Sequence, residues 1–160
     1  MSEFRVEKAT YIESLSEHDR ESLGILATAF LEYLDKKGIA GALVIVGGSV
    51  NPETRGSSRK DIDIVPLVKG VDDFEGFKNM VDFIRLTAGF EEKKVIEPIM
   101  DEEFNSPAIL RHDGAIALGY GNSTPMEFIP RYLCNLTIEE AIKKVQTRNT
   151  KYYCELIRSE

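Results

Sequence analysis

The segment at residues 61–68, DIDIVPLV, places two carboxylates, Asp61 and Asp63, inside a run that is otherwise apolar. Side chains alternate between the two faces of a strand, so both aspartates share one face, about 7 Å apart along the strand. Like charges on one face repel each other, and burial disfavours both of them. A cation between them resolves both problems, and an all-oxygen set favours a hard ion such as Mg²⁺. The alternative is a pair of solvent-facing acids beside a turn.

A candidate phosphate loop precedes the aspartates. The apolar run at residues 42–47 ends in Gly47, Gly48 and Ser49. Glycines let backbone N–H groups approach a ligand closely, and a Ser hydroxyl adds a donor. Mg²⁺ held by one or two carboxylates takes its other ligands from water and substrate phosphate. Because consecutive strands can be neighbours in a sheet, we expect this loop and the aspartates to form one site.

Three cations in the same loop, Arg55, Arg59 and Lys60, suit contacts with triphosphate oxygens. A solvated loop without a ligand is the alternative for them. A third carboxylate would complete a site for two metal ions, which clamp the attacking and leaving oxygens of a phosphoryl displacement. Glu127, in the apolar segment MEFI, is the best candidate and can bind metal or act as general base. Glu97, in VIEPI, occupies a similar context and stays an alternative.

These residues together resemble the signature of the DNA polymerase β nucleotidyltransferase superfamily. The signature is a hydrophobic residue followed by Gly and Gly or Ser, a gap, two acids that alternate with hydrophobic residues, and a later third acid. Here the gap between Ser49 and Asp61 is eleven residues. The resemblance implies a nucleotidyltransferase fold, with a mixed sheet flanked by helices. It also implies transfer of a nucleoside monophosphate from an NTP, expected to be ATP, to a hydroxyl with two Mg²⁺ ions.

The resemblance assigns catalysis and metal binding to Asp61, Asp63 and Glu127. It assigns nucleotide binding to the loop residues Gly47, Gly48 and Ser49 and to the cations Arg55, Arg59 and Lys60. The head domain of class II tRNA nucleotidyltransferases is one similar group, with the pattern GG-x-V-R-D, G-R and K-D-x-D. Several residues match that pattern in spacing: Gly47, Gly48, Val50, Gly56, Lys60, Asp61 and Asp63.

This sequence departs from the tRNA nucleotidyltransferase pattern at two places. Asn51-Pro52 stands where Arg-Asp is expected, and Ser57 replaces the Arg after Gly56. We also expect no neck, body or tail domain in a chain of this length. The small stand-alone nucleotidyltransferases are the other similar group, and they include antibiotic-modifying enzymes and members of toxin–antitoxin pairs. Length, acidity and the Arg55-Gly56 dipeptide fit this second group.

Local signals place these residues on expected elements. Ser16 with Asp19, and Thr137 with Glu140, have the spacing of helix N-terminal capping boxes. The Asp72-Asp73 pair is expected to open the second helix. Pro66 suggests a strand end or a sheet edge, and the C-terminal segment from Tyr152 onward is left unassigned. Helices are expected at 16–37, 72–88 and 137–148, and strands at 42–47, 61–68, 90–99, 114–120 and 125–129. This order predicts one α/β (α+β) domain, residues 1–160, with a mixed sheet and a hairpin formed by the last two strands.

Composition and charge indicate which kinds of binding partner and cell compartment to expect. The chain has 160 residues and a net charge of −7, with Lys and Arg scattered along it, so stable nucleic-acid binding is disfavoured. No apolar run is long enough for a membrane span, and the N-terminal segment is too charged for a secretory signal. We therefore expect no membrane association and a cytoplasmic location. Cys134 and Cys154 are expected to be free thiols, and neither histidine carries a partner pattern.

The sequence therefore predicts a nucleotidyltransferase whose acceptor hydroxyl belongs to a small molecule or a protein. A protein partner or a second copy of the chain can complete the acceptor site. One alternative is nucleotide addition to RNA 3′ ends, which a basic surface stripe would favour. Another is a non-catalytic module, similar to antitoxin relatives, that binds a nucleotide or a partner protein.

Overall fold

The chain forms a mixed sheet with helices, described here from a computed structural model for residues 3–7, 16–46, 61–97, 114–133, 135–149 and 154–159. Its elements are β1 (Glu3–Glu7), α1 (Glu17–Lys37), β2 (Gly41–Val46), β3 (Ile62–Val68), α2 (Phe74–Ala88), β4 (Glu91–Ile96), β5 (Ala115–Gly119), β6 (Met126–Phe128), α3 (Ile138–Asn149) and β7 (Cys154–Ser159). The predicted mixed class of helices and strands is confirmed. No helix in these ranges is long and apolar enough to cross a membrane.

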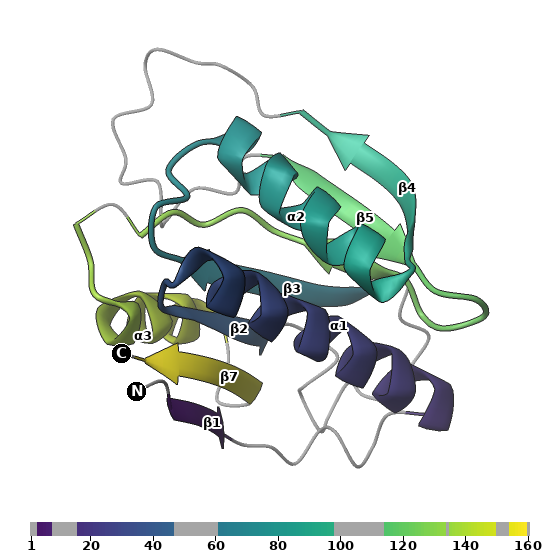
Figure 1. The fold of residues 1–160 in the computed structure, drawn as a ribbon, viewed down its shortest axis with the longest axis horizontal. Coiled ribbons are helices and arrows are strands. Elements are labelled where there is room, and N and C mark those ends of the chain that lie inside the picture. Colours follow the sequence, from purple (N-terminus) through teal and green to yellow (C-terminus); the bar gives the residue numbers. More distant parts are fainter. Residues whose placement is uncertain are drawn as a thin grey trace.

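Seven strands form the sheet in the order β1-β7-β2-β3-β6-β5-β4 (Figure 1). β3 and β6 run parallel, and each of the other described pairs is antiparallel. The predicted hairpin is confirmed as β5–β6. Its second strand lies beside β3, which also pairs with β2. The strand that carries the aspartates is therefore central, between the strand before it and the strand that carries Glu127.

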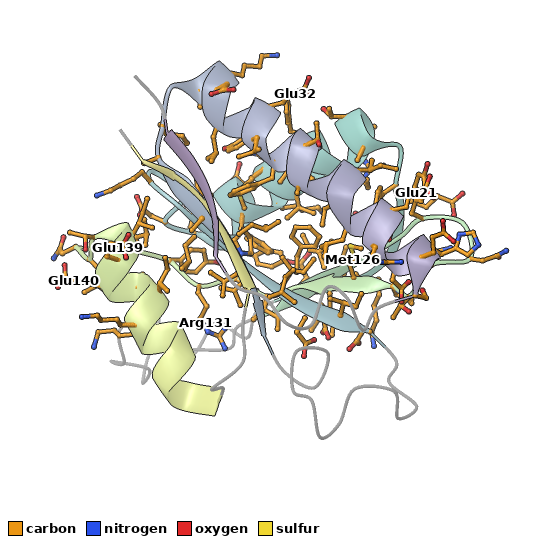
Figure 2. All side chains as sticks on the ribbon, turned by 90° about the horizontal axis from the view of Figure 1, so that it is seen from below. Glu21, Glu32, Met126, Arg131, Glu139 and Glu140 are labelled. Atoms are coloured by element: carbon orange, nitrogen blue, oxygen red, sulfur yellow. The ribbon has the colours of Figure 1, made fainter. Side chains whose placement is uncertain are left out.

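Helices cover both faces of the sheet (Figures 1 and 2). α1 and α2 pack on the face that includes Ile62 and Ile64, both with no exposed surface. α3 packs on the opposite face through a smaller cluster that includes Val65 and Leu67. Figure 2 shows this division, with Glu21 and Glu32 of α1 on one side and Glu139 and Glu140 of α3 on the other. The side chains of β3 thus alternate between two apolar layers, one on each face of the sheet.

α1 begins and ends where the sequence predicts. The Ser16 hydroxyl accepts a hydrogen bond from the Asp19 N–H at 3.1 Å, which satisfies one unpaired donor of the first turn. Gly38 ends the helix in the left-handed conformation, with φ of 65°. The Asp19 carboxylate differs from a capping-box acid, because both of its oxygens bond to Thr124.

The other two helices also begin at predicted caps. Asp73 accepts from the Gly76 N–H at 2.8 Å at the start of α2. Thr137 and Glu140 exchange reciprocal bonds at the start of α3, each from a backbone N–H to the other side chain at 3.1 Å. The bond from the Thr137 N–H lowers the pKa of Glu140. The predicted capping box is therefore confirmed.

Two strands were not predicted. β1 and β7 pair antiparallel with each other, and β7 also pairs with β2, so the sheet extends beyond β2. These strands come from opposite ends of the chain and are five and six residues long. Such short segments carry little periodic signal of their own, and their partners are distant in sequence. Residues 154–159 of the unassigned C-terminal segment therefore form a strand inside the sheet.

Pro66 lies inside a central strand, whereas the sequence predicted a strand end or a sheet edge there. β3 continues to Val68. Ile62 donates its N–H to Pro125 at 2.9 Å and the Ile64 carbonyl accepts from Ile129 at 2.8 Å, so even-numbered residues direct their polar groups toward β6. β6 ends at Phe128, so the nitrogen of Pro66 faces a position beyond that strand. A central strand tolerates proline there because no ladder donor is required.

Candidate functional site

Parallel pairing brings the predicted acids together. Asp63 of β3 and Glu127 of β6 are register partners, with Ile62 opposite Met126 and Ile64 opposite Phe128. Paired residues of neighbouring strands project their side chains to the same face of a sheet. Asp61 precedes β3 by one residue and shares the parity of Asp63, so it joins the same face.

The three carboxylates form one cluster. One oxygen from each of Asp61, Asp63 and Glu127 lies within 4.8 Å of the others, and all three residues are half-buried. A hard divalent cation binds oxygens at about 2.0–2.6 Å, so ligands on one ion stand up to about 5 Å apart. The spacing of the cluster therefore fits a shared cation, and the donor set is carboxylate oxygen throughout.

The described side chains of α3 do not pack on this cluster. The helix covers Val65 and Leu67, which lie on the same face of β3 as Asp63 but nearer the C-terminal end of the strand. Asp63 remains half-buried, whereas its neighbours Ile62 and Ile64 are fully buried on the other face. The cluster thus lies beside an apolar layer, and its three residues stay partly exposed.

Burial and the neighbouring charges raise the pKa of two of these acids, Glu127 and Asp63. Burial raises the pKa of Glu127 to about 7, with further contributions from the charges of Asp61 and Asp63. Burial also raises the pKa of Asp63, followed by the charge of Asp61, while a hydrogen bond from Glu127 acts in the opposite direction. In the metal-free protein Glu127 is therefore mostly protonated below about pH 7, and its hydrogen bonds with Asp61 and Asp63 contribute to this shift of its pKa.

Glu97, the alternative third acid, lies elsewhere. It follows β4, is exposed, and is separated from β6 by β5 in the sheet. It does not take part in the carboxylate cluster. Of the two acids that the sequence left open, Glu127 is the one that the fold brings to the aspartates.

A small residue beside the cluster was missed in the sequence. Ala117 of β5 is the register partner of Glu127 and is half-buried. Its neighbours Ile116 and Leu118 are fully buried in the layer under α1 and α2, so Ala117 faces the side of the carboxylates. A methyl group leaves room around Glu127 that a larger side chain would fill. The alternation of small and large residues in AIALG is the signal that could have indicated this.

The remaining predicted site residues lie outside the described ranges. These are Gly47, Gly48, Ser49, Arg55, Arg59 and Lys60. The last described residue before them, Val46, is the register partner of Asp63.

Comparison of the chain with protein-family models and with curated proteins gave no match.

Proposed function

We propose that this chain is a nucleotidyltransferase with the nucleotidyltransferase fold of the polymerase β superfamily. It transfers a nucleoside monophosphate from an NTP, ATP by expectation, to an acceptor hydroxyl. The observation that carries this proposal is the convergence of Asp61, Asp63 and Glu127 on one accessible face of β3 and β6. The sequence signature adds the glycine loop, which leaves a strand paired with β3.

Mg²⁺ is the cation that this set fits best, because all donors are carboxylate oxygens and such a site takes its other ligands from water and phosphate. When bound, two such ions would supply charge neutralisation and orient the reacting oxygens. Asp61 and Asp63 would hold metal from β3, and Glu127 would complete the set from β6. Gly47, Gly48 and Ser49 would bind the phosphates with Arg55, Arg59 and Lys60.

The transfer itself is a displacement at the α-phosphorus. The acceptor oxygen forms a bond to that phosphorus, the bond to the bridging oxygen breaks, and pyrophosphate leaves. The hydroxyl proton requires an acceptor, and a carboxylate of the cluster would take it as a general base. Positioning of the nucleotide against the acceptor would supply much of the remaining rate.

A net charge of −7 favours a small molecule or a protein side chain over RNA as acceptor. A protein partner or a second copy of the chain would complete the acceptor site. We place the reaction in the cytoplasm.

Calorimetric titration of ATP with Mg²⁺ tests the proposal. The wild type is compared with Asp61→Asn/Asp63→Asn, which keeps the shape of both side chains, and with Glu97→Gln as a matched charge control. We expect metal-dependent binding in the wild type and in Glu97→Gln. The double variant should lose at least about tenfold in affinity, because even outer-shell changes at metal sites cost that much. Absence of metal-dependent ATP binding in the wild type would contradict the proposal. If the wild type binds ATP with Mg²⁺, transfer of label from α-³²P-ATP to candidate acceptors tests the reaction itself.

A further inference from the structure

Asp19, in the first turn of α1, is buried although its side chain is charged. Its exposed fraction is 5%. One carboxylate oxygen accepts the Thr124 N–H at 2.7 Å, and the other accepts the Thr124 hydroxyl at 2.7 Å. Hydrogen bonds to a charged group at this length are stronger than neutral ones. A third bond joins the same two segments, from the Ser123 hydroxyl to the His18 carbonyl at 3.2 Å.

These contacts join two parts of the chain that are 105 residues apart in sequence. Thr124 lies in the turn between β5 and β6, and the chain enters β6 two residues later. Figure 2 shows Met126, the first residue of β6, near the N-terminal part of α1, in agreement with these bonds. α1 therefore anchors the start of β6.

The same turn also forms a backbone hydrogen bond with β3, the strand that carries Asp63. The Pro125 carbonyl accepts the N–H of Ile62, the residue between Asp61 and Asp63, at 2.9 Å. Glu127 follows Pro125 by two residues. The chain of contacts thus runs from Asp19 through Thr124 and Pro125 to both strands that supply the carboxylates.

β6 needs such an anchor because it is short. It has three residues, and its pairing with β3 covers three register positions. A shift of one residue in a strand moves every side chain to the opposite face. Such a shift would turn Glu127 away from the aspartates and would direct Met126 or Phe128 to the solvent side.

Stabilisation of α1 alone does not explain the contacts of Asp19. An acid in the first turn interacts favourably with the helix dipole without being buried, and Ser16 already provides the cap. Asp73 of α2 shows the purely local arrangement, since its bond goes to Gly76 three residues away at an exposed position. The Asp19 carboxylate instead directs both oxygens at the turn before β6.

We propose that Asp19 is a positioning residue for the carboxylate cluster. Its two bonds to Thr124 hold β6 in the register that places Glu127 beside Asp61 and Asp63. The inference deepens the proposed function and rests on it where cation binding is concerned. The positioning itself is a property of the metal-free protein.

Two measurements on Asp19→Asn test this inference. The amide keeps one acceptor oxygen but cannot accept both bonds. Hydrogen exchange of the Ile62 amide reports the bond to Pro125, and electron paramagnetic resonance of free Mn²⁺ reports cation affinity. We expect exchange at Ile62 to rise at least about tenfold relative to amides of α3, the factor that loss of a charged hydrogen bond gives. Mn²⁺ affinity should fall about tenfold or more.

Matched variants separate positioning from loss of stability. Asp73→Ala removes a helix cap at a comparable cost and should change neither readout by more than about twofold. Thr124→Val removes the hydroxyl bond and should reproduce part of the effect, whereas Thr124→Ser keeps the hydroxyl and should restore wild-type behaviour. Unchanged exchange at Ile62 in Asp19→Asn, or equal effects in Asp73→Ala, would overturn the inference.

The two readouts distinguish this inference from the proposed function. Absence of Mn²⁺ binding in the wild type would count against the metal site. In that case, faster exchange at Ile62 in Asp19→Asn would still support the positioning role. Mn²⁺ binding in the wild type with unchanged affinity and exchange in Asp19→Asn would overturn the positioning role alone.

Discussion

Asp63 and Glu127 face each other across β3 and β6, the one parallel pair among the described strands. The two strands of a parallel pair begin at the same end of the sheet. Asp61 and the Thr124–Pro125 turn, which precede β3 and β6, therefore also lie close together at that end. The carboxylates of two segments far apart in sequence thereby share one face. Their mutual repulsion is a property of the fold and has measurable consequences.

The stability of the metal-free protein should fall as pH rises from about 5 to about 7.5. The pKa of Glu127 is raised from 4.5 to about 7 in the folded state. The folded protein then binds more protons than the unfolded chain between these values, so deprotonation disfavours folding. Thermal unfolding in EDTA across this range measures the slope. Glu127→Gln should flatten it, and an unchanged slope in that variant would argue against the assignment.

Mg²⁺ should reverse this loss at high pH. At a concentration of one hundred times its dissociation constant, a ligand of the folded state adds about 2.7 kcal/mol of stability. The increase in melting temperature on adding Mg²⁺ should be larger at pH 8 than at pH 5.5, because a proton on Glu127 competes with the cation. Equal increases at both pH values would contradict competition at this residue.

Glu127→Gln and Glu97→Gln should behave differently although both remove one negative charge. Glu127 lies in the cluster, whereas Glu97 is exposed after β4. Glu127→Gln should weaken Mg²⁺ binding at least about tenfold, and Glu97→Gln should change it by less than about twofold. Calorimetric titration of both variants with Mg²⁺ decides the matter. Loss of affinity in Glu97→Gln instead would transfer the third-acid role to that residue.

Ile62→Ala should destabilise the protein by about 2–5 kcal/mol, because its side chain is fully buried under α1 and α2. Ile62→Val should cost about 0.5–1.5 kcal/mol. Leu86→Ala serves as the control, since Leu86 is 69% exposed and should change stability by less than about 0.5 kcal/mol. Urea unfolding measures all three. A small effect of Ile62→Ala would mean that the face opposite the carboxylates is not a packed core.

Deletion of residues 150–160 should cost ~3 kcal/mol or more, because it removes β7 from between β1 and β2. β2 would then present an unpaired edge, which promotes association. Thermal unfolding and size-exclusion chromatography report the two effects. Deletion of residues 1–7 removes the edge strand β1 alone and should be milder. The reverse order of severity would conflict with the strand order.

Sequence alone determined the parts of this protein that short-range chemistry controls. Capping side chains act within three residues of the helix starts, so Ser16, Asp73 and Thr137 mark α1, α2 and α3. Because side chains alternate along a strand, the sequence placed Asp61 and Asp63 on one face and Ile62 on the other. The sequence also identified the candidate acids, since a carboxylate within an apolar strand is costly without a partner.

Tertiary structure alone decided which strands that are distant in sequence became neighbours. β1 and β7 pair from opposite ends of the chain, and neither contains a signal for the other. The choice between Glu127 and Glu97 depended on the position of β6 next to β3, and Asp19 gained its contacts with Thr124 from the same packing. Pairing energies between distant segments depend on the whole set of buried contacts, so a local pattern can name the residues of a site but cannot bring them together.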